Sequence, residues 1–415
     1  MKLADIVDVF IAGDWGNESL SNDTPNAVFC IRGADIMSIR DHKYTDIPKR
    51  YISKRAKETK LLKVGDLVIE KSGGSPIQST GRITYISEDL IQAKKELVCS
   101  NFSIGIRVKS RWNPLYVYYY WQYIYNLGVF FNFESKTSGI KNLQLDSVLE
   151  AIAIEEISLE VQNQIVATLS SYDHKIALNR AINHNLVAMA KQLYDYWFVQ
   201  FDFPNEEGKP YKSSGGKMVW NQKLKKEIPK EWDSSILSEI SDITMGQSPE
   251  GSSYNEKKEG IIFYQGSADF GAFFPSIRQY TTSPIRFAMK GDVLMSVRAP
   301  VGIVNIANND CCIGRGLVSL RSKDSSTLYI YYLLKQLDFV FQKRNINGTT
   351  FGSITKDDLS QLPIIKPCKE IIVNYEKICS SIFNKLISID IELCSLTKQR
   401  DELLPLLMNG QVTVG

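Results

Sequence analysis

The sequence lacks the signatures of the common catalytic sites. It has no GxxxxGK[ST] phosphate loop, and it has no Asn-Pro-Pro-Tyr or Asp-Pro-Pro-Tyr tetrapeptide of the kind that adenine methyltransferases use. Only three histidines are present, and two of them, His174 and His184, lie on different turns of one predicted helix, which argues against a paired acid–base or metal role. The carboxylates are scattered and form no two-metal nuclease pattern. We therefore expect no catalytic residue and no metal ligand in this chain.

Cysteines in CxxC spacing and long apolar runs are missing as well. The seven cysteines include no CxxC pair, which favours free thiols in a reducing compartment over a disulfide framework or a zinc ribbon. The start of the chain is interrupted by Asp5, Asp8 and Asp14, so it does not read as a signal peptide. The most apolar stretch, residues 115–131, is short for a membrane span and contains Gln122. We expect a cytoplasmic protein that does not contact a membrane.

Two long amphipathic helices organise the chain. Residues 158–201 contain neither proline nor glycine, and their apolar residues recur at three- and four-residue steps. This stripe comprises Ile165, Leu169, Ile176, Leu186, Met189 and Leu193. Residues 369–408 repeat the pattern with Ile378, Ile382, Ile389, Leu393, Leu396 and Leu403. Helices of this length need a partner along the stripe, which predicts that the two pair with each other.

The segments that precede the two helices resemble each other. LADIVDV (3–9) matches LSEISDI (237–243), Gly65–Asp66 matches Gly291–Asp292, and Cys99 aligns with Cys312. We predict an α+β fold with two duplicated globular domains separated by a pair of long antiparallel, coiled-coil helices. The expected boundaries are 1–157 for the first domain, 158–201 for the first spacer helix, 202–232 for a connector, 233–368 for the second domain and 369–410 for the second spacer helix.

Basic and glycine-rich stretches indicate DNA binding, although the net charge of +3 alone would not require it. Residues 40–63 carry an excess of lysine and arginine that can track a phosphate backbone; a solvated charged face is the alternative. Loops at 70–82, 136–142, 245–256 and 347–356 offer Gln, Ser, Thr, Lys and Arg side chains, which can bond to base edges. The candidate DNA contacts are Lys54, Arg55, Lys71, Ser72, Gln78, Arg82, Lys136, Lys141, Gln247, Ser248, Arg298, Thr349, Thr350 and Lys356.

Two DNA-reading domains on a rigid spacer would read a split site. If the long helices pack antiparallel, half-sites on one face of B-DNA should lie about one turn, roughly 34–36 Å, apart. The domains differ in sequence, so the two half-sites should differ. A structural coiled-coil adaptor would explain the helices, but it would explain neither the repeated loops nor the basic stretch.

Several segments resemble one known family, the specificity (S) subunits of type I restriction–modification systems. The segment from Tyr194 to Trp232 resembles the central conserved region of that family, and TMGQSPEGSSYN (244–255) resembles the start of its target-recognition domain. KSGGSPIQSTGRI (71–83), GTTFGSITKDDLSQLPI (348–364) and KQRDELLPLLMNGQV (398–412) resemble further motifs. The resemblance spans essentially the whole chain.

The resemblance implies a non-catalytic subunit of a prokaryotic restriction and adenine-N6 methylation complex. Its partners would be double-stranded DNA, two methyltransferase (M) subunits and restriction (R) subunits. S-adenosylmethionine would bind to M, and ATP and Mg to R, so that this chain itself would hold no cofactor. The aromatic side chains of Tyr194, Trp197 and Phe198 would serve M-subunit docking. A fused restriction–methylation enzyme would need motifs that the chain lacks.

Overall fold

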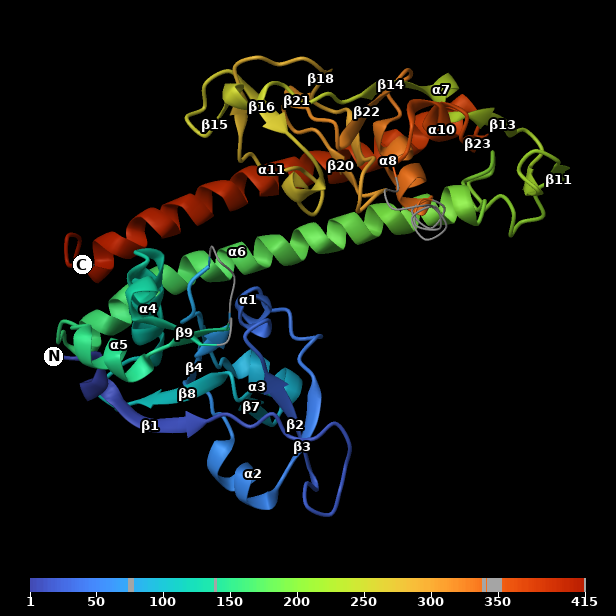
Figure 1. Ribbon diagram of the computed structural model, residues 1–415. Helices are drawn as coiled ribbons and strands as arrows, with labels where there is room; N and C mark the ends of the chain where they lie inside the picture. Colours follow the sequence, from blue (N-terminus) through green and yellow to red (C-terminus); the bar gives the residue numbers. More distant parts are fainter. Residues whose placement is uncertain (74–77, 138–139, 338–340, 342–352, 414–415) are drawn as a thin grey trace. The chain divides into compact units, whose positions relative to one another are not determined.

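A computed structural model describes residues 1–73, 78–137, 140–337, 341 and 353–413. The chain divides into two compact units: unit 1 comprises Met1–Arg180 and Glu392–Gly415, and unit 2 comprises Ala181–Ile391. Two long helices, α6 (Leu159–Tyr194) and α11 (Lys369–Met408), contribute residues to both units (Figure 1). A π-helical turn, η3 (Asp195–Val199), continues α6. The predicted α+β fold with two long helices is confirmed.

Unit 1 is built on the antiparallel sheet β1-β8-β4-β6, beside the sheets β3-β2-β7 and β5-β10-β9. The strands are β1 (Val7–Ala12), β2 (Asn26–Ile31), β3 (Lys49–Ile52), β4 (Leu67–Glu70), β5 (Ser72–Gly73), β6 (Ile83–Tyr85), β7 (Leu97–Cys99), β8 (Ser103–Val108), β9 (Glu134–Thr137) and β10 (Ile140–Leu143). The further helices are η1 (Leu3–Ile6), α1 (Asp35–Arg40), α2 (Lys54–Lys60), α3 (Glu88–Lys94), α4 (Pro114–Asn126), η2 (Val129–Phe133) and α5 (Leu145–Ala151).

Unit 2 contains the sheets β14-β22-β19-β20, β15-β17-β16-β21-β18, β11-β12 and β13-β23. The strands are β11 (Met218–Asn221), β12 (Lys226–Pro229), β13 (Asp233–Ile236), β14 (Ser241–Met245), β15 (Tyr254–Asn255), β16 (Ile261–Tyr264), β17 (Tyr280–Thr281), β18 (Phe287–Ala288), β19 (Val293–Ser296), β20 (Val304–Ile306), β21 (Cys311–Ile313), β22 (Leu317–Ser322) and β23 (Pro363–Lys366). The helices are α7 (Leu237–Ile240), η4 (Gly251–Ser253), η5 (Ser267–Asp269), α8 (Thr327–Gln336) and α10 (Lys356–Ser360).

The duplication is visible in one pair of side-chain contacts that occurs in both units. In unit 1 the carboxylate of Asp66, just before β4, accepts bonds from Nε and a terminal nitrogen of Arg107 at 2.7 and 2.8 Å. In unit 2 Asp292, just before β19, accepts the same two bonds from Arg321 at 2.9 and 3.0 Å. Both aspartates are buried and also accept the backbone N–H of the residue three positions earlier. The predicted match of Asp66 with Asp292 is therefore confirmed.

The predicted match of Cys99 with Cys312 is wrong by one residue. In unit 1 the carbonyl of Cys99 accepts the N–H of Asp14, and in unit 2 the carbonyl of Ile313 accepts the N–H of Gln247. Cys99 and Ile313 are therefore equivalent, and both point into a buried apolar cluster. A shift of one residue along a strand exchanges its two faces, so the resemblance between the cysteines misled the alignment.

The aromatic stretch that begins at Leu115 forms α4, which is buried in unit 1. Pro114 opens the helix, and the side chain of Asn113 accepts the N–H of Leu115 at 2.8 Å, so the helix start is capped. The fully buried Trp121 donates its indole N–H to the carbonyl of Gly81 at 2.7 Å. Across the described parts of the chain, no helix has the length and apolar character needed to span a membrane.

The long helices bury most of the predicted stripe. In unit 1 they run antiparallel, because Asp173 contacts Arg400 and Asn179 contacts Glu392, and Ile165, Leu169 and Ile176 are buried. In unit 2 their remaining parts share one core, in which the Tyr375 hydroxyl donates to the carbonyl of Ala190 at 3.4 Å.

Two members of the stripe were misassigned. Met189 of α6 and Ile378 of α11 are 55% and 47% exposed, so they lie on the outer faces of their helices. The apolar spacing identified the other members correctly. It also selects positions that the neighbouring helix does not cover, because the stripe is wider than the contact between the two helices.

Candidate nucleic-acid interface

The first turn of α2 in unit 1 presents two unpaired cations. Ser53 caps the helix by accepting the N–H of Ala56 at 3.2 Å, and Lys54 and Arg55 follow with their side chains exposed. Neither forms an ion pair within the described residues of the chain. Positive charge in a first turn does not stabilise a helix, because the N-terminal end of the helix dipole is itself positive. These two cations are therefore available to an external anion.

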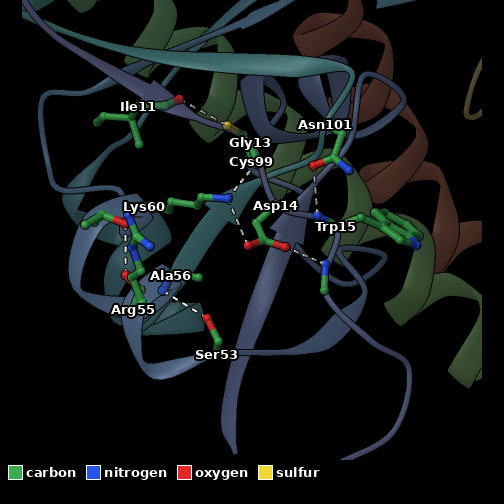
Figure 2. A network of polar contacts seen from close by, with 12 residues as sticks. Ile11, Gly13, Asp14, Trp15, Ser53, Arg55, Ala56, Lys60, Cys99 and Asn101 are labelled. Carbon is green, nitrogen blue, oxygen red and sulfur yellow. Dashed lines mark hydrogen bonds and ion pairs between the residues drawn. The ribbon is translucent and has the colours of Figure 1, made fainter. Parts of the chain in front are cut away.

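The later lysines of α2 have internal partners. Lys57 pairs with Glu96 at 2.5 Å. Lys60 donates to the carboxylate of Asp14 at 3.0 Å and to the carbonyl of Gly13 at 3.3 Å (Figure 2). Only some of the cations in the basic stretch 40–63 are thus free of internal partners. The last turn of α2 binds the loop after β1 through Lys60.

That loop and the turn between β7 and β8 are joined in unit 1. The N–H of Asp14 donates to the carbonyl of Cys99 at 2.7 Å, and the N–H of Trp15 donates to the side-chain oxygen of Asn101 at 3.2 Å (Figure 2). A Cβ at Gly13 would lie 2.0 Å from the carbonyl oxygen of Ser100, so only glycine fits there. None of these residues was predicted, because the loop carries no recognised motif.

The loop Glu70–Arg82 reaches the same turn, since the backbone N–H groups of Lys71 and Ser72 both donate to the carbonyl of Phe102. Lys71 and Ser72 are half-buried, and the Ser72 hydroxyl donates to Asn142 at 2.5 Å. Gln78 is exposed. Of the predicted contacts in this loop, Gln78 is therefore the one whose side chain is fully available.

Two predicted contacts, Arg82 and Lys141, are instead structural. Arg82 forms a two-bond pair with buried Glu70 at 2.8 and 2.5 Å. Lys141 is buried, pairs with Glu134 at 3.1 Å and donates to the carbonyl of Gln78 at 3.3 Å. Burial acts to raise the pKa of Glu134, but hydrogen bonds from Thr80 and Lys141 outweigh it and lower that pKa. Both cations are already paired inside unit 1, which argues against a role of either in binding phosphate.

In unit 2 the equivalent segments gather four of the predicted residues. The N–H of Gln247 donates to the carbonyl of Ile313, and the hydroxyl of Ser248 accepts the N–H of Arg315 at 3.2 Å. Val297, next to Arg298, donates its N–H to Gly316 and accepts that of Ile354, two residues before Lys356. The side chains of Gln247, Arg298, Arg315 and Lys356 are exposed, and that of Ser248 is half-buried.

Arg315 belongs to this group although it was not predicted. It lies in a Gly-Arg-Gly segment, 314–316, outside the loops that the sequence singled out. Thr349 and Thr350 lie outside the described residues, and so does the side chain of Lys136, whose backbone pairs with Lys141 in β9–β10.

The predicted docking residues lie in the core of unit 2. Tyr194, Trp197 and Phe198 are only 2%, 4% and 3% exposed, and their rings pack against Tyr375. A partner subunit cannot touch them, so this prediction is corrected: their role is to join α6 to the rest of unit 2. The neighbouring Tyr196 is 38% exposed.

Comparisons with known proteins agree on one family. The profile of the type I restriction modification DNA specificity domain matches residues 1–187 and 229–401. The putative type I restriction enzyme MjaX specificity subunit of Methanocaldococcus jannaschii is 31% identical over 314 residues, which cover 74% of this chain and 70% of that protein. The HindI specificity subunit of Haemophilus influenzae is 23% identical over 337 residues, covering 67% and 73%. The solved S subunit from M. genitalium has a TM-score of 0.58 at 15% identity, covers 98% and 95%, and shows a likeness of fold.

Proposed function

This chain belongs to the type I restriction–modification DNA specificity family, and on that premise we propose that unit 1 and unit 2 each read one half of an asymmetric, bipartite DNA site. As a specificity subunit of a type I restriction–modification complex, the chain recognises DNA and does not catalyse a reaction itself. The proposal concerns which parts of the chain read the DNA and which hold the other subunits.

One observation supports the asymmetry of the proposed DNA site. A similar framework of hydrogen bonds places Trp15 and Asn101 in unit 1 where unit 2 has Ser248 and Arg315. Base edges are distinguished by the donors and acceptors that face them, so different side chains on one scaffold select different bases. Two units of one fold therefore suit two unlike half-sites.

Mapping of methylated bases tests this proposal directly. The chain would be co-expressed with its methyltransferase partner, and N6-methyladenine would be located in host DNA by single-molecule sequencing. We expect a split, non-palindromic motif that disappears when the gene for this chain is deleted. A continuous motif, or methylation that is indifferent to this chain, would contradict the proposal.

We propose that the phosphate backbone is held partly by Lys54 and Arg55. Replacing both by glutamate should weaken binding to all DNA sequences by about tenfold or more and reduce the slope of log K against log salt by about two, because two phosphate contacts are lost. The measurement is a salt titration of the assembled complex on specific and unrelated duplexes. Lys57→Ala is the matched control, since Lys57 is already paired with Glu96. A salt slope equal to that of the unaltered complex would exclude the assignment.

The complex is proposed to contain two methyltransferase subunits that hold S-adenosylmethionine, together with restriction subunits that use ATP and Mg, in the cytoplasm of a prokaryotic cell. We propose that a methyltransferase subunit contacts the outer face of α6 in unit 2. Ile182 and Met189 of α6 are 41% and 55% exposed and lie seven residues apart, which places them on one stripe, and Tyr196 of the following turn η3 is 38% exposed. Large apolar side chains exposed in a row are typical of a protein interface.

Ile182→Asp combined with Met189→Asp should abolish co-purification of the methyltransferase subunit, because the interface would bury two unpaired charges. Affinity for the subunit is expected to fall by about 100-fold or more, as measured by pull-down and by calorimetry with the purified partner. His184→Asp is the control, since it is exposed and lies about 140° around the helix from Met189. Retained assembly in the double variant would place the docking face elsewhere.

A further inference from the structure

The turn between β21 and β22 of unit 2, Gly314–Arg315–Gly316, is held by its backbone from three sides. The N–H of Gly314 donates to the carbonyl of Tyr264 at 2.8 Å, and the N–H of Arg315 donates to the Ser248 hydroxyl at 3.2 Å. The carbonyl of Gly316 accepts the N–H of Val297 at 2.9 Å. These three partners belong to three different segments, so the turn is anchored to three parts of unit 2.

The two glycines let neighbouring backbones approach the turn closely. A Cβ at Gly314 would lie 3.0 Å from Cα and the carbonyl oxygen of Gln265, and one at Gly316 would lie 2.8 Å from the same oxygen. A Cβ at Gly246 would lie 2.2 Å from the carbonyl oxygen of Gly314. Side chains are therefore excluded on both sides of Arg315, which is the one residue of the turn with room for a side chain.

The guanidinium of Arg315 has no structural task within the described residues. Its side chain is exposed, and none of the ion pairs among the described residues of unit 2 involves it. Two other arginines of the unit are committed: Arg321 binds buried Asp292, and Arg278 binds buried Asp269 at 2.9 and 2.5 Å. An arginine held on a rigid, glycine-flanked turn and left without a carboxylate is suited to an external acceptor pair.

The neighbouring side chains are of the kinds that read bases. Gln247 and Gln265 are exposed on the two segments that touch the turn, and Arg298 is exposed beside Val297. One acid of these segments, Asp269, is buried and compensated, since it accepts the N–H of Gln265 at 2.9 Å and bonds from Arg278. The surface around Arg315 therefore offers hydrogen-bond donors and positive charge.

Unit 1 uses the equivalent position differently. There the turn residue is Asn101, whose side-chain oxygen accepts the N–H of Trp15 at 3.2 Å. In unit 2 the direction of this bond is reversed: the loop supplies the acceptor, the hydroxyl of Ser248, and the turn supplies the backbone N–H of Arg315. The loop and the turn therefore stay joined in unit 2, but the Arg315 side chain takes no part in the bond that joins them.

We propose that Arg315 is a specificity-determining residue of unit 2 that bonds O6 and N7 of one guanine in the major groove, with Gln247 beside it facing an adjacent base. The fork of an arginine matches these two acceptors, and a glutamine can bond an adenine in the same two-point manner. This inference rests on the proposed function, because it assigns the reading of one half-site to a single turn.

The test uses the full chain assembled with its methyltransferase partner. In Arg315→Ala the methylation motif should lose its requirement for guanine at one position of one half-site, and discrimination in a duplex competition assay at that position should fall roughly 5- to 150-fold. Arg315→Lys should keep the overall affinity but lose much of the discrimination, since a lysine lacks the two-point fork. Lys290→Ala, which removes another exposed charge of unit 2, should leave the motif unchanged.

Other results of these experiments would contradict either the role of Arg315 or the proposed function. If Arg315→Ala keeps the motif of the unaltered complex, or weakens binding equally to every sequence, Arg315 does not read a base. A loss of the requirement in both half-sites would also contradict the assignment to unit 2. An unaltered complex that shows no sequence preference would overturn the proposed function together with the inference that rests on it.

Discussion

Asp66→Ala should lower the free energy of unfolding of unit 1 by about 3 kcal/mol. The Asp66 side chain is fully buried. Its carboxylate accepts hydrogen bonds from two nitrogens of Arg107 and from the backbone N–H of Lys63, at 2.7 to 2.8 Å. Alanine removes all three hydrogen bonds and leaves a guanidinium that is only 31% exposed without its counter-charge. This loss of unfolding free energy is at the low end for a broken buried ion pair, because part of the Arg107 side chain can be hydrated.

Chemical denaturation combined with peptide-level hydrogen exchange measures this effect and locates it in unit 1. Glu58→Ala is the control, since Glu58 is exposed on α2 and its removal should change stability by less than about 0.5 kcal/mol. Asp66→Ala combined with Arg107→Leu should recover part of the loss, because no unpaired charge then remains. If the single and double variants were equally stable, the charge pair would not explain the conservation of this contact in both units of the fold.

Glu376→Gln should stabilise unit 2 above pH 7 by up to about 3 kcal/mol and should have no effect below pH 4.5. The Glu376 carboxylate accepts the N–H of Tyr329 in the first turn of α8 at 2.9 Å. Burial raises the pKa of Glu376 to about 7, and hydrogen bonds from Tyr329 and Leu328 offset only part of this shift.

The sign follows from proton binding. Between pH 4.5 and 7 the folded state binds more protons at Glu376 than the unfolded state, so the contribution of this group to stability falls as the pH rises through that window. Glutamine cannot titrate and keeps the acceptor for the N–H of Tyr329. Melting temperatures of both proteins, measured from pH 4.5 to 8, should therefore coincide at the acidic end and separate towards pH 8.

Unit 1 contains a related arrangement for this experiment. The buried Gln162 of α6 accepts the N–H of Asn113, the residue before α4, with its side-chain oxygen at 2.8 Å. Gln162→Glu should make the stability of unit 1 depend on pH in the same window. Glu370→Gln, at an exposed site of α11, is the control that should show no pH-dependent difference. A gap between Glu376→Gln and the unaltered chain that is constant with pH would contradict the raised pKa.

The sequence was sufficient for the repeated and the periodic features. The lengths of α6 and α11 follow from uninterrupted apolar spacing, and the duplication was detectable because Gly65–Asp66 and Gly291–Asp292 begin equivalent strands in both units. The exposed cations Lys54 and Arg55 could be identified because the basic stretch around them exceeds what its nearby acids can neutralise.

The same reasoning failed where the identity of a side chain does not determine its partner. Arg82 and Lys141 have the composition of DNA contacts, but each meets a buried glutamate that lies 12 or 7 residues away in the chain. Arg315 was missed for the converse reason: nothing local distinguishes it, and its value arises from Ser248, Val297 and Gln265, which fold around its turn.

The sequence by itself determined the family, the two-fold repetition and the long helices, because motif spacing and apolar periodicity are properties of contiguous residues. Only the tertiary structure decided which charges are free, which aromatic side chains belong to the core and which strand residues are equivalent. Those properties depend on contacts between distant segments, as at Trp197 and Tyr375, or on a strand register in which one residue exchanges inside for outside, as at Cys99 and Ile313.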